Sequence, residues 1–204
     1  DPLSSSELSK VSPSHEPSHA TQELPKALKV SAPRDLLELP FASAQQKQPS
    51  LIGESDAMCA LKERVARFAQ SSAPALVLGE TGTGKELCAR ALHEQSPWRE
   101  GPFVAINCAS IPRELISAEL FGCRVGAFTG ATSREGLICS AHQGTLFLDE
   151  VGELPLEAQA VLLRVLERYE VQPVGSDHTK KVSFRLVCAT HRDLSQLVKE
   201  GRFR

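Results

Sequence analysis

Residues 75–94 constrain the fold of this chain more than any other segment. They open with a short apolar stretch, residues 75–78, which has the length of one buried strand. A glycine-rich turn follows. Apolar residues then recur at i, i+1, i+4 and i+5, as on one face of a helix: Leu87, Cys88, Ala91 and Leu92. A strand, a glycine-rich turn and a helix in this order predict a phosphate-binding loop.

The turn supplies the residues that we expect to bind phosphate. Glycines let consecutive backbone N–H groups point at one anion, and the helix N-terminus and Lys85 add positive charge beside it. The pattern G-x-x-x-x-G-K is followed by Glu86, where Ser or Thr usually helps to hold Mg²⁺. The alternative is a glycine-rich turn with a solvated lysine. The predicted nucleotide-binding residues of this stretch are Gly79, Glu80, Thr81, Gly82, Thr83, Gly84, Lys85 and Glu86.

A second apolar stretch, residues 145–148, runs directly into Asp149 and Glu150. An apolar strand that ends in two acidic residues is the partner that a phosphate-binding loop needs. Asp149 can hold Mg²⁺ through water, and Glu150 can orient or deprotonate an attacking water molecule. The alternative is a pair of surface acids at the end of a strand.

The rest of the chain from residue 51 onward alternates strands and helices. Further strands are predicted at residues 103–107 and 184–189, and a hairpin at residues 170–182. Helices are predicted near Pro112 and Pro155, after a cap at Asp193, and after Ser55 or Asp56. The apolar face predicted for the first of these helices comprises Met58, Leu61, Val65 and Phe68.

Composition excludes several classes of protein. The formal net charge of −2 gives no electrostatic reason to expect this chain itself to bind nucleic acid. The six cysteines form no C-x-x-C pair, and the histidines do not cluster with them, so reduced cysteines in a cytoplasmic protein are favoured over a metal site. No apolar run approaches the roughly 18 residues of a membrane span, and no signal peptide is visible.

Residues 1–50 differ from the rest of the chain. They contain many serines, a single aromatic residue (Phe41), no glycine, and prolines at positions 2, 13, 17, 25, 33, 40 and 49. Such a segment cannot bury enough apolar surface to offset its ordering entropy, so we predict a disordered Ser/Pro-rich linker. Residues 35–39 could instead form a docking motif. The chain begins without Met and stops after GRFR, so we expect it to be a piece of a longer protein. Within this piece, we expect residues 51–204 to be ordered.

Residues 126–131 have the sequence GAFTGA and are predicted to form an exposed loop that presents one phenylalanine. Taken alone, the pattern favours an ordinary turn with a buried Phe128. We call these residues the GAFTGA loop. They are Gly126, Ala127, Phe128, Thr129, Gly130 and Ala131.

Several stretches together resemble one family, the sigma-54-interaction AAA+ ATPases of bacterial enhancer-binding transcription activators (NtrC-like). The resemblance covers residues 51–204, and GAFTGA is its most specific motif. Glu86 is ordinary in this family and leaves Mg²⁺ to Asp149 and water. The matching stretches are GETGTGKE (79–86), FVAINC (103–108), ELFG (119–122), GAFTGA (126–131), GTLFLDE (144–150), LLRVLE (162–167), CATHRDL (188–194) and GRFR (201–204).

The resemblance implies further site residues. Asn107 corresponds to the residue that restrains the catalytic glutamate until the γ-phosphate is sensed. Thr190 lies at the first sensor position, and His191 replaces the asparagine often found next to it. Arg204 corresponds to the first of two arginine fingers that reach into a neighbouring subunit; at the end of the chain we expect it to be unanchored. Cys123, Arg124 and Val125 depart from the more usual polar sequence before the loop.

The fold implied by the resemblance is α/β: the three-layer αβα core of a P-loop NTPase of the AAA+ class, with a parallel sheet and a crossover helix after each strand. Its strand order would be 5-1-4-3-2, so residues 51–204 should show 1-4-3-2 with the first strand left as an edge, and the fifth strand and the helical lid should lie beyond residue 204. The implied partners are the sigma-54 RNA polymerase holoenzyme, bound through Phe128 and Thr129, and further copies of the chain in a hexameric ring. DNA would be bound only through a C-terminal domain.

Three functions fit these patterns. The first is an ATP-hydrolysing activator that remodels the closed promoter complex, with ATP and Mg²⁺ as ligands. The second is a regulatory module that binds nucleotide and partner without useful turnover, and the third is another AAA+ remodelling ATPase, such as a chaperone or chelatase subunit. The GAFTGA loop argues against the third, and intact Lys85, Asp149 and Glu150 argue against loss of turnover by divergence in the second.

Overall fold

The computed structural model describes residues 51–127 and 131–204. The predicted linker, residues 1–50, and three residues of the GAFTGA loop, Phe128, Thr129 and Gly130, lie outside the described residues. In the part of the chain that is described, no helix combines the length and the apolar character needed to cross a lipid bilayer.

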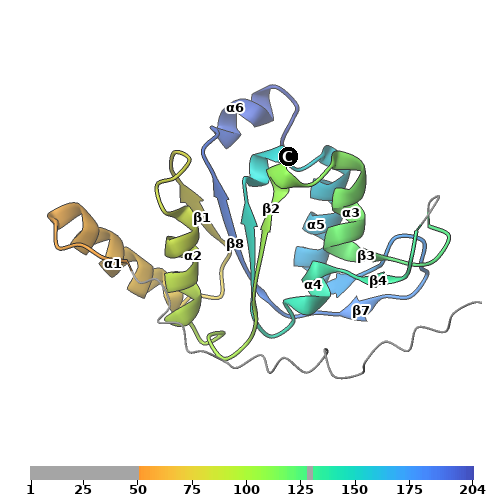
Figure 1. Ribbon diagram of the computed structural model, residues 1–204, viewed down its shortest axis with the longest axis horizontal. Coiled ribbons are helices and arrows are strands. Elements are labelled where there is room, and N and C mark those ends of the chain that lie inside the picture. Colours follow the sequence, from red (N-terminus) through yellow and green to blue (C-terminus); the bar gives the residue numbers. More distant parts are fainter. Residues whose placement is uncertain (1–50, 128–130) are drawn as a thin grey trace, which may run out of the picture. The chain divides into compact units, whose positions relative to one another are not determined.

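The centre of the fold is a four-stranded parallel sheet in the order β1-β8-β5-β2 (Figure 1). This order confirms the predicted 1-4-3-2 arrangement. Each of these strands is followed in the sequence by a helical element, as expected for parallel strands joined by crossovers. The bounds are β1 (Ala75–Leu78), β8 (Arg185–Thr190), β5 (Thr145–Asp149) and β2 (Phe103–Asn107).

Helices cover the two faces of the sheet, which gives three layers (Figure 1). On one face lie α1 (Asp56–Ala69) and α2 (Lys85–Glu94). On the other face lie α3 (Arg113–Phe121), α4 (Leu137–Ser140) and α5 (Leu156–Arg168). The two central strands, β5 and β8, bury side chains on both faces because successive residues of a strand point to opposite sides.

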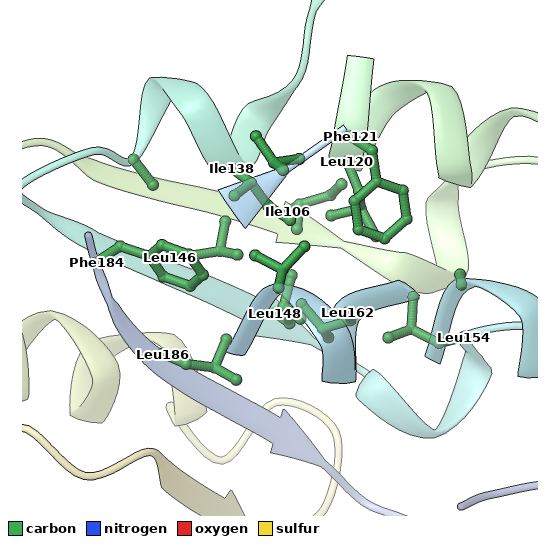
Figure 2. Close-up of a cluster of buried hydrophobic side chains, with 14 of the residues drawn as sticks. Ile106, Leu120, Phe121, Ile138, Leu146, Leu148, Leu154, Leu162, Phe184 and Leu186 are labelled. Atoms are coloured by element: carbon green, nitrogen blue, oxygen red, sulfur yellow. The ribbon is translucent and has the colours of Figure 1, made fainter. Parts of the chain in front are cut away.

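The two cores follow from this alternation. Phe147 and Val187 pack with α1 and α2, whereas Leu146 and Leu186 pack with α3, α4 and α5. Figure 2 shows the second cluster, in which Leu146 and Leu148 of β5 face Ile138, Phe121 and Leu162. Because β5 lies in the middle of the sheet and is buried on both faces, it holds Asp149 in a fixed place at its end.

β1 lies at the edge of the sheet, as the predicted strand order implies, although its apolar sequence taken alone fits a buried strand. Leu76 and Leu78 are 48% and 67% exposed, while Ala75 and Val77 pack against α1 and α2. Within residues 51–127 and 131–204, β1 pairs with β8 alone, so it is an edge strand with one covered face. Phe68, predicted on the apolar face of the first helix, is also exposed.

Shorter elements connect the layers. Ser55 accepts a hydrogen bond from the Met58 N–H and caps α1, and Asp193 caps α6 (Leu194–Lys199), as predicted. The predicted hairpin at residues 170–182 is confirmed by antiparallel pairing of β6 (Glu170–Val171) with β7 (Lys180–Lys181). The remaining elements are η2 (Cys108–Ser110), β3 (Gly122–Cys123), β4 (Arg134–Glu135) and η3 (Val151–Glu153).

A buried arginine joins the first two helices to the sheet. Arg185 on β8 is 1% exposed. Its Nη1 donates to the carbonyls of Ala69 (2.9 Å) and Leu92 (3.2 Å), and its Nη2 donates to the carbonyl of Phe68 (2.7 Å). These carbonyls belong to the last turns of α1 and α2, where backbone oxygens lack helical partners and a cation is favourable. Arg185 therefore caps two helices at once.

Because His93 is buried, we expect the free energy of unfolding to depend on pH. Its Nδ1 lies 2.9 Å from Thr145 Oγ1 inside the core, beside the Phe103 ring. Burial, then the charges of Arg185 and Arg90, lower the pKa of His93 below 6.5. The folded state therefore resists protonation of His93, so its contribution to stability is complete above the unfolded pKa of about 6.5 and is lost as the pH falls from there toward the folded pKa.

We expect the free energy of unfolding to fall between pH 7.5 and pH 5.5, by at most about 1.4 kcal/mol per pH unit from this group. Urea titrations at both pH values measure the change. His93→Asn keeps a polar atom at the Nδ1 position without titrating, so it should flatten the difference. An equal pH dependence in the variant would show that His93 is not the group responsible.

Candidate active site

The phosphate-binding loop joins β1 to α2 and lies at the carboxyl end of the sheet. Gly82 and Gly84 have φ values of 82° and 87°, a left-handed conformation that favours glycine. Nothing lies within 4 Å of a Cβ built on Gly82, so backbone conformation and not space requires glycine there. The Gly79 N–H donates to the Thr190 carbonyl at 3.3 Å, which fixes the start of the loop to β8.

Lys85 begins α2 and is 8% exposed. Its Nζ donates to the carbonyls of Gly79 and Glu80, both at 3.1 Å, and lies 3.4 Å from Glu150 Oε1. A buried ammonium is stabilised by such acceptors. The loop therefore holds a positive charge in place before any anion enters, as a phosphate site requires.

Asp149 and Glu150 follow each other at the end of β5, as predicted. The Glu150 N–H donates to Asp149 Oδ1 at 3.0 Å. Glu150 has φ 51° and ψ 51°, a left-handed conformation that is costly for a residue with a Cβ and that recurs at functional sites. This conformation turns the Glu150 side chain toward Lys85 and β8.

The two oxygens of the Glu150 carboxylate have different partners. Oε1 faces Lys85. Oε2 accepts from the His191 Nδ1 (2.8 Å), the His191 N–H (3.3 Å) and the Thr190 hydroxyl (3.4 Å). Burial alone would raise the pKa of Glu150, but the His191 hydrogen bonds and the charge of Lys85 outweigh it and lower the pKa below its ordinary value. Glu150 is therefore ionised at neutral pH.

Asn107 lies at the end of β2, in register with Asp149 of β5. Its Oδ1 accepts from the Ala109 N–H at 2.9 Å and caps η2. In the described part of the chain, the hydrogen-bond and ion-pair partners of the Glu150 carboxylate are Lys85, Thr190 and His191, so Asn107 does not hold it in this structure. The restraining role of Asn107 stays a prediction.

A cavity of about 560 Å³ brings most of the predicted residues together. Its wall includes Asn107, Asp149 and Glu150 together with residues of the phosphate-binding loop. Glu86 also lines it, although its carboxylate pairs with Arg90 at 2.7 Å. The remaining lining residues are Thr81, Gly82, Gly84, Lys85, Leu87, Ala109, Glu153 and His191.

The cavity fits a phosphate chain with a divalent ion. Left-handed glycines, a helix N-terminus and a buried lysine provide the anion-binding side. Among residues 51–127 and 131–204, no three His, Cys, Asp or Glu side chains converge as a complete metal site. A Mg²⁺ ion would therefore depend on Asp149, on water and on phosphate oxygens, an arrangement that Mg²⁺ commonly adopts.

Arg204 lies outside this cavity, and the prediction of an unanchored terminus is wrong. The Arg204 N–H donates to Gln159 Oε1 at 2.9 Å. Gln159 is a buried amide of α5, and its Nε2 also donates to the carbonyls of Leu154 (2.8 Å) and Arg202 (3.1 Å). The backbone at Arg204 is thus held against α5, so the position from which its side chain extends is fixed.

In the sequence, the GAFTGA loop lies between β3 and β4, which pair as a short antiparallel ladder. The Cys123 thiol is buried and donates to the Thr132 carbonyl at 3.1 Å, which ties the two sides of the loop base together. The Arg124 N–H donates to the Val174 carbonyl at 3.0 Å, and a Cβ on Gly175 would come within 2.9 Å of the Ala127 Cβ. The loop base therefore packs against the β6–β7 hairpin.

The parallel sheet, the loop between β1 and α2, and the acidic end of β5 define the core of a P-loop NTPase of the AAA+ class. The chain belongs to the sigma-54 interaction domain family, which matches residues 51–204.

Comparison with known proteins supports this assignment. The chain is 50% identical over 180 residues to the DNA-binding transcriptional regulator NtrC of Azospirillum brasilense, covering 88% of this chain and 37% of that protein. It is 50% identical over 155 residues to the regulatory protein AtoC of Escherichia coli strain K12, covering 76% of this chain and 34% of AtoC.

Among solved structures, NtrX from Brucella abortus in complex with ATP matches with a TM-score of 0.71 and 38% identity, over 76% of this chain and 33% of that one. The chain thus spans about a third of the length of these relatives.

Proposed function

We propose that this domain hydrolyses ATP. The observation that carries the proposal is the meeting of Lys85 and Glu150 at 3.4 Å on the wall of the cavity that the phosphate-binding loop also lines. A related structure, NtrX from Brucella abortus, is described in complexes with ATP and with ADP, which supports a nucleotide as the ligand.

The residues divide the reaction between them. The loop N–H groups and Lys85 bind the β- and γ-phosphates, and Glu150 orients the water that attacks the γ-phosphate. Mg²⁺ would neutralise charge that develops on the phosphate oxygens, and Asp149 would hold it through water. Thr190 contacts Glu150 and fits a sensor of the γ-phosphate, while Arg204 would serve a neighbouring subunit in a hexameric ring.

We further propose that hydrolysis drives transcription activation through sigma-54. The GAFTGA loop would engage the sigma-54 RNA polymerase holoenzyme and remodel the closed promoter complex. The support is the family assignment and the position of the loop base, which lies on β3–β4 and not at the nucleotide cavity. DNA binding would belong to a C-terminal domain of the full-length protein.

Substitutions in the loop test this division of roles. In the full-length protein we expect ATP hydrolysis, and we expect Phe128→Ala and Thr129→Ala each to keep basal ATPase activity within about twofold while sigma-54 binding is lost. ATPase assays and pull-down with sigma-54 measure the two effects. Loss of nucleotide binding with intact sigma-54 binding would instead place the loop in the active site. Absence of ATPase activity in the unsubstituted protein would favour the alternative function, a regulatory module that binds nucleotide and partner without turnover.

A further inference from the structure

His191 makes the shortest contact to the carboxylate that the proposed reaction needs. Its Nδ1 lies 2.8 Å from Glu150 Oε2, whereas the other donors to that oxygen lie at 3.3 Å and 3.4 Å. The contact is possible because β5 and β8 are parallel neighbours, with Leu148 opposite Cys188, so that both strands end at the same level. The inference that follows rests on ATP hydrolysis as the proposed function.

The chemistry of the contact fixes the proton on His191. An ionised carboxylate can only accept hydrogen bonds, so the His191 Nδ1 must donate and therefore carries a proton. The Oε2 oxygen of Glu150 is thus bound by Thr190, the last residue of β8, and by His191, which follows it. The other oxygen of Glu150, Oε1, faces Lys85 and the cavity.

The Lys85 ammonium cannot contact both the Glu150 carboxylate and a phosphate equally well. In this structure its ammonium faces Oε1 of Glu150 and two loop carbonyls. Phosphate oxygens entering the loop would attract the same ammonium, because a charge-assisted contact to phosphate is strong. Glu150 would then lose its partner on the Oε1 side, and the contacts to Oε2 would decide where the carboxylate points.

We propose that His191 is a positioning residue that holds Glu150 through Oε2 and leaves Oε1 free to orient the attacking water. His191 itself touches neither water nor phosphate in this role. Its side chain is 44% exposed on the cavity wall, so it contributes little to the core and can be replaced without unfolding the domain. The role is therefore separable from stability.

Three substitutions in the full-length protein test the role. Asn places a side-chain N–H one bond from Cγ, where His carries Nδ1, so His191→Asn should keep kcat within about threefold. His191→Phe keeps a ring without the donor, and His191→Ala removes both. We expect each of these two to lower kcat about tenfold, the worth of one hydrogen bond to a charged group, with the Kd for ATP unchanged.

A measurement without nucleotide tests the contact itself. Histidine ¹⁵N NMR of the nucleotide-free protein should show a protonated Nδ1 for His191, and Glu150→Ala should shift this histidine toward the Nε2–H tautomer. His142 is an internal control, since its Nδ1 accepts from the Ser183 N–H at 3.0 Å and should keep the same tautomer in both proteins.

The outcomes separate this inference from the proposed function. If Glu150→Gln loses hydrolysis while His191→Ala and His191→Phe keep it, hydrolysis stands and the role of His191 is overturned. Equal losses in the Asn, Phe and Ala variants would overturn the hydrogen-bond explanation. If the unsubstituted protein does not hydrolyse ATP, the proposed function fails and the inference fails with it.

Discussion

Replacement of Lys85 by alanine is expected to lower the affinity for ATP by roughly 100-fold or more, because two or more charge-assisted contacts to phosphate disappear together. Lys85 is the buried cation of the loop, and the backbone N–H groups alone would leave the terminal phosphates without a counter-charge. Titration with a fluorescent ATP analogue measures the loss.

Two controls sharpen this prediction. Lys62 also donates to a glycine carbonyl, that of Gly53 at 2.8 Å, but is exposed on α1, so Lys62→Ala should bind ATP as the unsubstituted protein does. Glu150→Gln should keep binding and lose hydrolysis, because it removes the water-orienting carboxylate but not the phosphate contacts. Equal affinity for ATP in the Lys85→Ala and unsubstituted proteins would refute the proposed site.

Replacement of Arg185 by methionine is expected to lower the free energy of unfolding by about 3 kcal/mol, because two buried carbonyls lose their guanidinium donor and a third, part-buried carbonyl loses one of its donors. Phe68, Ala69 and Leu92 supply these carbonyls from α1 and α2. A domain of this size is stable by only about 5–15 kcal/mol, so the loss should be visible as a large shift of the urea midpoint.

Matched variants distinguish the helix-capping contacts from charge alone. Arg185→Lys keeps the charge but cannot reproduce a planar fork of donors, so it should be intermediate. Arg99, whose side chain is 65% exposed beside Glu100, is the control, and Arg99→Met should change stability by less than about 0.5 kcal/mol. If Arg185→Met unfolds at the same urea concentration as the unsubstituted chain, the three contacts contribute nothing net.

The parts of the site that were predictable have local signals. The loop before Lys85 is recognisable because a strand, glycines and a helix follow one another within residues 75–94. Asp149 and Glu150 are recognisable because an apolar strand runs directly into them. The order of the strands came from family resemblance, since four short apolar segments do not by themselves say which are neighbours.

The parts that were missed depend on contacts between distant segments. Arg185 falls within an apolar strand, and its acceptors are carbonyls of two helices, which no sequence pattern identifies. Gln159 holds the backbone of Arg204 from the buried side of α5, where a helical pattern predicts only apolar residues. The contact between His191 and Glu150 could have been found, because the predicted order makes their strands neighbours and both residues follow a strand end.

The edge position of β1 follows from the predicted strand order, but the exposure of its side chains cannot be read from its own four residues. These apolar residues fit a buried strand, whereas in the described residues one face of β1 is uncovered, and Leu76 and Leu78 lie on that face. Burial depends on what covers a strand as well as on its own sequence. Periodicity alone therefore does not distinguish the two cases.

The six cysteines are unevenly buried, and only Cys59 is fully in the exposed class. Burial raises the pKa of Cys108 and of Cys188 to about 12, so both stay protonated at neutral pH, and protonated thiols react slowly with alkylating reagents. Cys59 is the exposed cysteine of the six, and it lies on α1, outside the residues that line the nucleotide cavity. A maleimide dye should therefore attach at Cys59 first, which provides a fluorescent reporter on this domain without any substitution.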